Sequence, residues 1–159
     1  MHKMALIIVI AVCALAAALF WPAEPQARAR SLSNGSFAEV VLYQNSDGHF
    51  YADAEINGQI IRFLVDTGAN TVALTENDAR KANVDFSPLD YEVLGEGAAS
   101  AVRGQRARLD TLRIGDIVGT DVEAAVIEGS TMSLLGLSFL DEVDEIVIQK
   151  RQMALRKQL

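Results

Sequence analysis

Cysteine and histidine are almost absent from the sequence. It contains one cysteine, Cys13, and two histidines, His2 and His49. Cys13 lies in an apolar N-terminal segment, so the rest of the chain has no disulfide, no thiol nucleophile and no cysteine metal site. The shortage of histidine excludes multi-histidine metal sites and nearly every histidine-based catalytic triad. Carboxylates, hydroxyls and lysines remain as catalytic groups, and we predict no metal and no cofactor.

Charged residues are missing from the segment Met4–Ala23. Its length matches the roughly 20 apolar residues that a helix needs to cross a bilayer. We predict that residues 1–23 form either a retained transmembrane anchor or a cleaved signal sequence. Residues 24–36 are rich in Pro, Ala, Ser and Arg without periodicity, which is typical of a linker. A single domain is then expected over residues 37–159.

Basic residues are in the minority within this domain. Three of the 14 basic residues and one of the 21 acidic residues precede residue 37, which leaves 11 basic and 20 acidic residues, a net charge of −9. Such a surface repels phosphate backbones and argues against nucleic-acid binding. The exception is the C-terminal tail with Lys150, Arg151, Arg156 and Lys157, which we interpret as a solvated strand end.

Short β-rich runs separated by turn residues make up most of the domain. We predict strands at Ala38–Gln44, His49–Ile56, Gln59–Val65, Tyr91–Leu94, Arg106–Gly115, Asp121–Glu128, Ser133–Leu140 and Glu145–Gln149. Many short strands with turns about every 8–12 residues indicate an all-β sandwich or barrel.

Local signals refine this pattern. Gln59–Val65 is almost continuously apolar, so we expect it to be buried on both faces. One helix is predicted to begin after Thr75 as N-cap, with Asp78 three residues later. Ser130 and Ser133 have no base nearby in the sequence and are predicted to be loop residues.

The stretch "FLVDTGANTVAL" places Asp66 between two apolar runs. A carboxylate in such a setting must be hydrogen-bonded or paired. Gly68 allows close approach of the backbone, and Thr67 and Asn70 can supply hydrogen bonds. One purpose of such an arrangement is a carboxylate adapted to acid–base chemistry.

This stretch resembles the active-site loop of aspartic proteases, and two further segments extend the resemblance. "SLLGLSFL" (Ser133–Leu140) looks like the apolar-apolar-glycine segment that runs behind that loop and is followed by a short helix. "YEVLGEGAASAVRG" (Tyr91–Gly104) occupies the place of the flap hairpin. The resemblance is to the retropepsin-like group of membrane-anchored bacterial enzymes. It implies a single-lobed, closed β-barrel-like sandwich with one or two short helices.

The resemblance assigns roles to named residues. It implies that Asp66 is catalytic. It implies active-site loop support by Thr67, Gly68, Ala69, Asn70, Leu134, Leu135 and Gly136. It implies flap or substrate contacts by Gly95, Glu96, Gly97 and Ala98. Two features depart from the family pattern, because Asn70 stands where serine or threonine is common and "GEGAAS" has no aromatic residue.

The sequence holds a single Asp-Thr-Gly, whereas the family mechanism needs two carboxylates that share one proton. The resemblance therefore implies an aspartic endopeptidase that is a homodimer, cleaves polypeptides and has an acidic to mildly acidic optimum. Glu145–Gln149 and the segment after it are the candidates for completing the dimer sheet. The expected location is the bacterial inner membrane, single-pass, with the protease domain on the periplasmic side.

Two other functions remain open at this point. The domain could bind peptides or form a dimer without hydrolysing peptide bonds, as Asn70 and the flap sequence allow. Alternatively, it could be a structural β-domain in which Asp66 only caps a turn.

Overall fold

The computed structural model describes residues 37–97 and 101–159. The predicted anchor or signal sequence of residues 1–23 and the linker of residues 24–36 lie outside these ranges and stay predictions. Within the described ranges, no helix is long and apolar enough to span a membrane.

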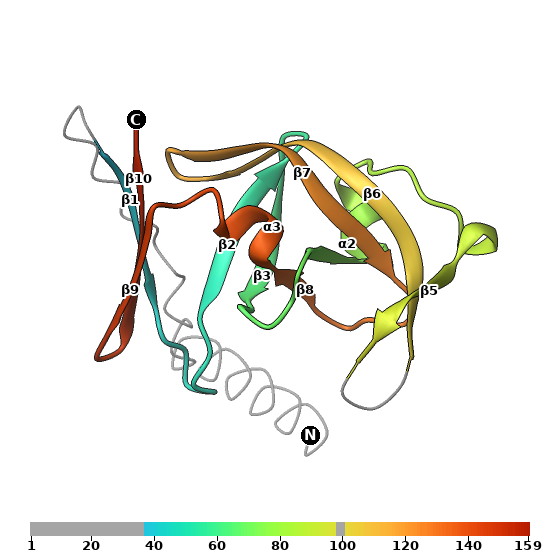
Figure 1. Cartoon of the computed structure of the whole chain (residues 1–159), viewed down its shortest axis with the longest axis horizontal. Coiled ribbons are helices and arrows are strands. Elements are labelled where there is room, and N and C mark those ends of the chain that lie inside the picture. Colours follow the sequence, from blue (N-terminus) through green and yellow to red (C-terminus); the bar gives the residue numbers. More distant parts are fainter. Residues whose placement is uncertain (1–36, 98–100) are drawn as a thin grey trace, which may run out of the picture.

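The described residues form ten strands, two short α-helices and one 3-10 turn (Figure 1). In chain order these are β1 (Phe37–Tyr43), β2 (Tyr51–Ile56), β3 (Gln59–Val65), β4 (Val72–Thr75), α2 (Glu76–Lys81), η1 (Pro88–Asp90), β5 (Glu92–Glu96), β6 (Ala101–Ile114), β7 (Ile117–Ile127), β8 (Ser133–Leu135), α3 (Leu137–Leu140), β9 (Glu145–Gln149) and β10 (Gln152–Gln158).

Six of the strands close into a barrel. The larger sheet has the order β2-β3-β8-β4-β7-β6-β5, and a pairing between Glu55 of β2 and Arg113 of β6 closes the first six of these strands into a ring. Strand β5 lies outside this ring and pairs only with β6. The prediction of an all-β, closed barrel-like fold with one or two short helices is confirmed.

The β6–β7 hairpin is longer than predicted, and its inward-facing residues change parity along its length. Leu109 and its partner Val122 are buried, but the next buried residue of β6 is Leu112, opposite Gly119. The change coincides with Asp121, whose φ is 54°. Because alternate residues of a strand face opposite sides, the hairpin presents opposite faces to the core at its two ends.

Strand β3 corrects a prediction. Ile61 and Phe63 are fully buried, but Ile60 is 52% exposed and Arg62 points into solvent. The strand belongs to a closed barrel, which has one interior, and in the described structure no second layer covers the outer face of β3. An almost continuous apolar run was therefore a poor guide to burial on both faces.

The chain ends form a second sheet of three strands, in the order β1-β10-β9. Figure 1 shows it at one end of the molecule, with β5 at the opposite end. The interpretation of the tail as a solvated strand end was wrong in part. Strand β10 is the central strand, Met153 and Leu155 are buried, and Arg156 forms ion pairs with Glu39 and Glu145.

Candidate functional site

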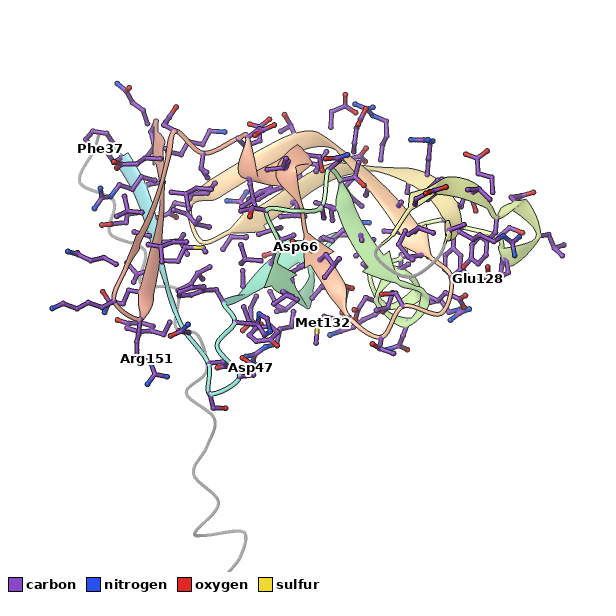
Figure 2. All side chains as sticks on the ribbon, turned by 60° about the horizontal axis from the view of Figure 1, so that its bottom comes forward. Phe37, Asp47, Asp66, Glu128, Met132 and Arg151 are labelled. Carbon is purple, nitrogen blue, oxygen red and sulfur yellow. The ribbon has the colours of Figure 1, made fainter. Side chains whose placement is uncertain are left out.

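Asp66 begins the loop that joins β3 to β4, named here the Asp66 loop (residues 66–71). Figure 2 shows Asp66 near the middle of the molecule, between the end that carries Arg151 and the end that carries Glu128. The side chain of Asp66 is half-buried, and the next two residues, Thr67 and Gly68, are exposed.

Backbone groups hold the Asp66 carboxylate and its peptide in place. The Gly68 N–H donates to Asp66 Oδ1 at 2.8 Å. The Asp66 N–H donates to the Leu135 carbonyl at 3.1 Å, and the Ala69 N–H donates to the Asp66 carbonyl at 3.3 Å. A Cβ at Gly68 would lie 3.1 Å from Asp66 Oδ1. The loop therefore fixes the carboxylate while leaving it open to solvent.

The predicted support segment Leu134–Leu135–Gly136 lies directly beside the loop. Strand β8 runs parallel to β3 and antiparallel to β4, so it lies between the two strands that the loop connects. Gly136 has no room for a side chain, because a Cβ there would lie 2.2 Å from the Thr71 carbonyl oxygen and 2.7 Å from that of Ala69.

The start of helix α3 binds the second half of the loop. The Leu137 N–H donates to the Ala69 carbonyl at 2.8 Å, and the Ser138 N–H donates to the Asn70 carbonyl at 3.0 Å. Ser138 Oγ also accepts from the Val72 N–H at 2.9 Å. The sequence analysis missed Ser138, because a serine within "GLSFL" has no local signal of a partner 66 residues away.

Ser133 corrects the interpretation of this residue as part of a loop. As the predicted strand Ser133–Leu140 implied, it opens β8, and it is 1% exposed, but the strand ends at Leu135 and residues Leu137–Leu140 form α3. The Ser133 hydroxyl accepts from the Thr75 N–H at 3.1 Å and donates to Asp78 Oδ2 at 2.6 Å. The predicted N-cap is confirmed, because the Thr75 side chain accepts from the Asp78 N–H at 3.0 Å.

The predicted flap residues lie on the β5–β6 hairpin. Gly95, Glu96 and Gly97 are exposed, and the register between β5 and β6 shifts between Val93 and Gly95. Ala98 lies outside the described residues. From Glu92 onward, the described residues of the hairpin include no aromatic residue.

Tyr91 precedes β5 and links the base of the hairpin to helix α2 and to the loop that follows α2. Its hydroxyl donates to Glu76 Oε1 at 3.0 Å, and its ring stacks on Phe86 with 6.4 Å between centroids. Burial, together with the hydrogen bond to Glu76, raises the pKa of Tyr91 to about 12. The hydrogen bonds from Arg80 and then from Tyr91 lower the pKa of Glu76.

Two clefts are formed by the described residues near these elements, and neither is lined by Asp66. One, of about 640 Å³, lies between the start of α2 and the segment from Gly129 to Ser133. The other, of about 320 Å³, is lined by Thr71 and by the paired Ala107 and Ala124, among others.

The chain is similar in sequence to a known protein family and to known proteins. The family model described as gag-polyprotein putative aspartyl protease matches residues 52–142. A protein of Sinorhizobium sp., described as an uncharacterised protein in the cobV 5′ region, is 34% identical over 120 residues. That match covers 74% of this chain and 52% of the relative, so the chain spans about half the length of this curated relative.

Two solved structures are similar in fold. A retropepsin-like aspartic protease from Rickettsia conorii is 32% identical, with a TM-score of 0.66 and coverage of 77% of this chain and 91% of that chain. The EIAV protease complexed with the inhibitor HBY-793 is 20% identical, with a TM-score of 0.53 and coverage of 66% and 97%. The second likeness bears on the fold alone.

Proposed function

Because the chain belongs to the retropepsin-like aspartic proteases, we propose that it is an aspartic endopeptidase whose active site is built from the Asp66 residues of two chains. The observation that carries this proposal is the Asp66 loop. It holds a single, solvent-accessible carboxylate by backbone hydrogen bonds from Gly68 and to Leu135. The sequence offers no second Asp-Thr-Gly to complete the pair.

The proposed chemistry needs two carboxylates in different protonation states. Ionising the second of two carboxyl groups in close contact is costly, so the pair shares one proton over a range of pH. The ionised Asp66 draws a proton from water, which attacks the peptide carbonyl. The protonated Asp66 of the second chain donates a hydrogen bond to that carbonyl oxygen. Since this state exists only between the two macroscopic pKa values of the pair, activity is expected at acidic to mildly acidic pH.

The terminal sheet offers the second chain a place to bind. Strand β9 is an edge strand, and Ile146 and Ile148 face the same side as the buried Leu155 and Met153 with which they pair. Yet Ile146 is 36% and Ile148 60% exposed, because this face extends beyond the core. Exposed apolar edge strands are uncommon in proteins that remain monomeric.

We propose that β9 pairs with β9 of a second copy in an antiparallel, two-fold arrangement. Centred on Val147, this pairing places Ile146 opposite Ile148 of the other chain and Glu145 opposite Gln149. The two glutamates do not meet, and each is already paired with Arg156 of its own chain. The pairing thus covers apolar surface without opposing like charges.

A peptide substrate would lie extended between the Asp66 loops and the β5–β6 hairpins, bound by main-chain hydrogen bonds. The cleft at Thr71 lies next to the loop and offers space for a substrate side chain. The apolar Ala107 and Ala124 line it together with the charged Arg106, Arg108 and Glu123. From their sequence alone, we further propose that residues 1–23 tether the domain to the bacterial inner membrane, on its periplasmic side.

The test is to incubate the purified full-length chain and its Asp66→Asn variant with a peptide library over a series of pH values. We expect peptide cleavage by the wild type and a loss of at least about 10³-fold in the variant. Cleavage that survives the substitution would contradict the proposal. Binding of peptides without cleavage would favour the peptide-binding alternative.

A further inference from the structure

Strand β8, which holds the Asp66 peptide, is short and forms few strand pairings. It has three residues, which pair with β3 at Phe63, Leu64 and Val65 and with β4 only at Ala73. Its Leu135 carbonyl accepts the hydrogen bond from the Asp66 N–H at 3.1 Å. A shift of β8 along β3 would therefore remove a backbone contact that holds Asp66.

A buried hydroxyl fixes the start of this strand. Ser133 is 1% exposed, and its Oγ accepts from the Thr75 N–H at 3.1 Å and donates to Asp78 Oδ2 at 2.6 Å. Thr75 ends β4 and caps α2, so the Ser133 side chain ties β8 to the junction of these two elements. Loss of the hydroxyl would leave a backbone N–H without its partner at a buried position.

The acceptor in this cluster is itself held in place. Asp78 Oδ2 also accepts from Thr75 Oγ1 at 3.0 Å, and Thr75 Oγ1 accepts from the Asp78 N–H at 3.0 Å. One carboxylate oxygen therefore receives two hydroxyl groups from different elements. Hydrogen bonds to an ionised acceptor are shorter and stronger than those between neutral groups.

The surroundings of Asp78 make a carboxylate acceptable there. Asp78 is half-buried and lines the cleft of about 640 Å³ together with Ser133 and Thr75. Water in this cleft can solvate the rest of the carboxylate, so Asp78 needs no cation as partner.

From these contacts we infer that Ser133 and Asp78 are positioning residues for Asp66. They hold β8 in the register at which the Leu135 carbonyl meets the Asp66 N–H. They act through β8 and touch neither substrate nor the reacting carboxylate. The relevance of this inference to catalysis rests on the proposed function of Asp66, but the positioning itself can be measured without activity.

The test is the hydrogen-exchange rate of the Asp66 amide in the full-length chain, resolved by NMR. In Ser133→Ala and in Asp78→Ala we expect this amide to exchange at least about tenfold faster, because the Leu135 bond opens locally. The Leu112 amide in the distant β6–β7 hairpin should keep its rate. Asp78→Asn retains an acceptor oxygen, so its Asp66 amide should stay within about threefold of the wild-type rate.

Asn77→Ala is the matched control, because Asn77 is an exposed neighbour on α2 that lines the same cleft. An Asp66 rate in Ser133→Ala and Asp78→Ala equal to that of this control would overturn the inference. So would an equal rise at Asp66 and Leu112, which reports only a loss of global stability. If Ser133→Ala does not fold, the Asp66 amide exchange rates of the two Asp78 variants test the inference without it.

Activity gives a second readout. With a cleaved peptide, kcat of Ser133→Ala should fall at least about fivefold while KM changes less than about twofold, because a displaced Asp66 affects chemistry more than substrate binding. An unchanged kcat would count against the inference. A wild type that cleaves nothing would refute the proposed function, and the exchange rates would still decide the positioning.

Discussion

At the scale of single residues, backbone groups contribute more to the site than side chains do. Asp66 accepts hydrogen bonds from the Gly68 and Ala69 N–H groups and donates one to the Leu135 carbonyl. Such contacts depend on the fold of the loop and not on the identity of neighbouring side chains. Thr67 is exposed, and we predict from the family resemblance that its side chain bonds across a dimer axis.

Tyr91 gives a prediction for alkaline pH. Its pKa is raised to about 12 from an ordinary value of 10.0, because burial and the bond to Glu76 favour the neutral phenol. The stability that this provides is fully present below about pH 10 and is lost as the pH rises through about 12. Ultraviolet titration of tyrosinate in the folded wild type should show a step near pH 12 that belongs to Tyr91.

The Tyr91→Phe variant should lack this step and show a shallower fall in the free energy of unfolding between about pH 10 and 12. Persistence of the step near pH 12 in the variant would assign it to Tyr43 or Tyr51 and contradict the prediction.

At the scale of elements, the site depends on close packing of the Asp66 loop against the end of β8. Gly136→Ala should destabilise the fold by about 3 kcal/mol or more, because the new Cβ meets backbone atoms that cannot move aside. Urea denaturation should show a lower midpoint at an unchanged m-value. Gly95→Ala is the matched control, since a Cβ there meets nothing within 4 Å. Equal urea midpoints for Gly136→Ala and Gly95→Ala would contradict the prediction, because they would show that the loop moves to accommodate the added Cβ.

The sequence was informative where local patterns decide the structure. The strand at Gln59–Val65 follows from its apolar run, the helix after Thr75 from its capping residues and the short helix after Gly136 from the family resemblance. It was less informative where distant segments decide. The tail was assigned to solvent, because its basic residues conceal the alternation of Met153 and Leu155, which only the neighbouring β1 and β9 explain.

The same limit applies to the candidate site. The Asp66 loop and the segment that supports it are predicted from "DTGA" and "LLG". Ser133 and Ser138 were not found as anchoring residues, because their partners lie 55 to 66 residues away and are brought close only by the barrel.

At the scale of the whole molecule, the chain is a closed barrel with half of a proposed active site. The terminal sheet at one end and the β5–β6 hairpin at the other leave the Asp66 loop between them (Figures 1 and 2).

The proposed interface predicts that Ile148→Lys weakens the dimer at least about tenfold, because a charge enters an apolar strand pairing. Sedimentation velocity over a concentration series measures the dissociation constant. Ile60→Lys is the control, as Ile60 is also an exposed strand isoleucine, at 52% against 60% for Ile148. A dimer equally strong in both variants would place the interface elsewhere.

The most direct test of the central claim is a subunit-mixing measurement. Wild-type and Asp66→Asn chains are mixed in varied ratios at constant total concentration, well above the dissociation constant, and peptide cleavage is measured after exchange of subunits. If each site needs two Asp66 residues, activity follows the square of the wild-type fraction, and an equal mixture retains about a quarter of the wild-type activity. Activity proportional to the wild-type fraction, about half in an equal mixture, would show that one chain suffices and would contradict the account.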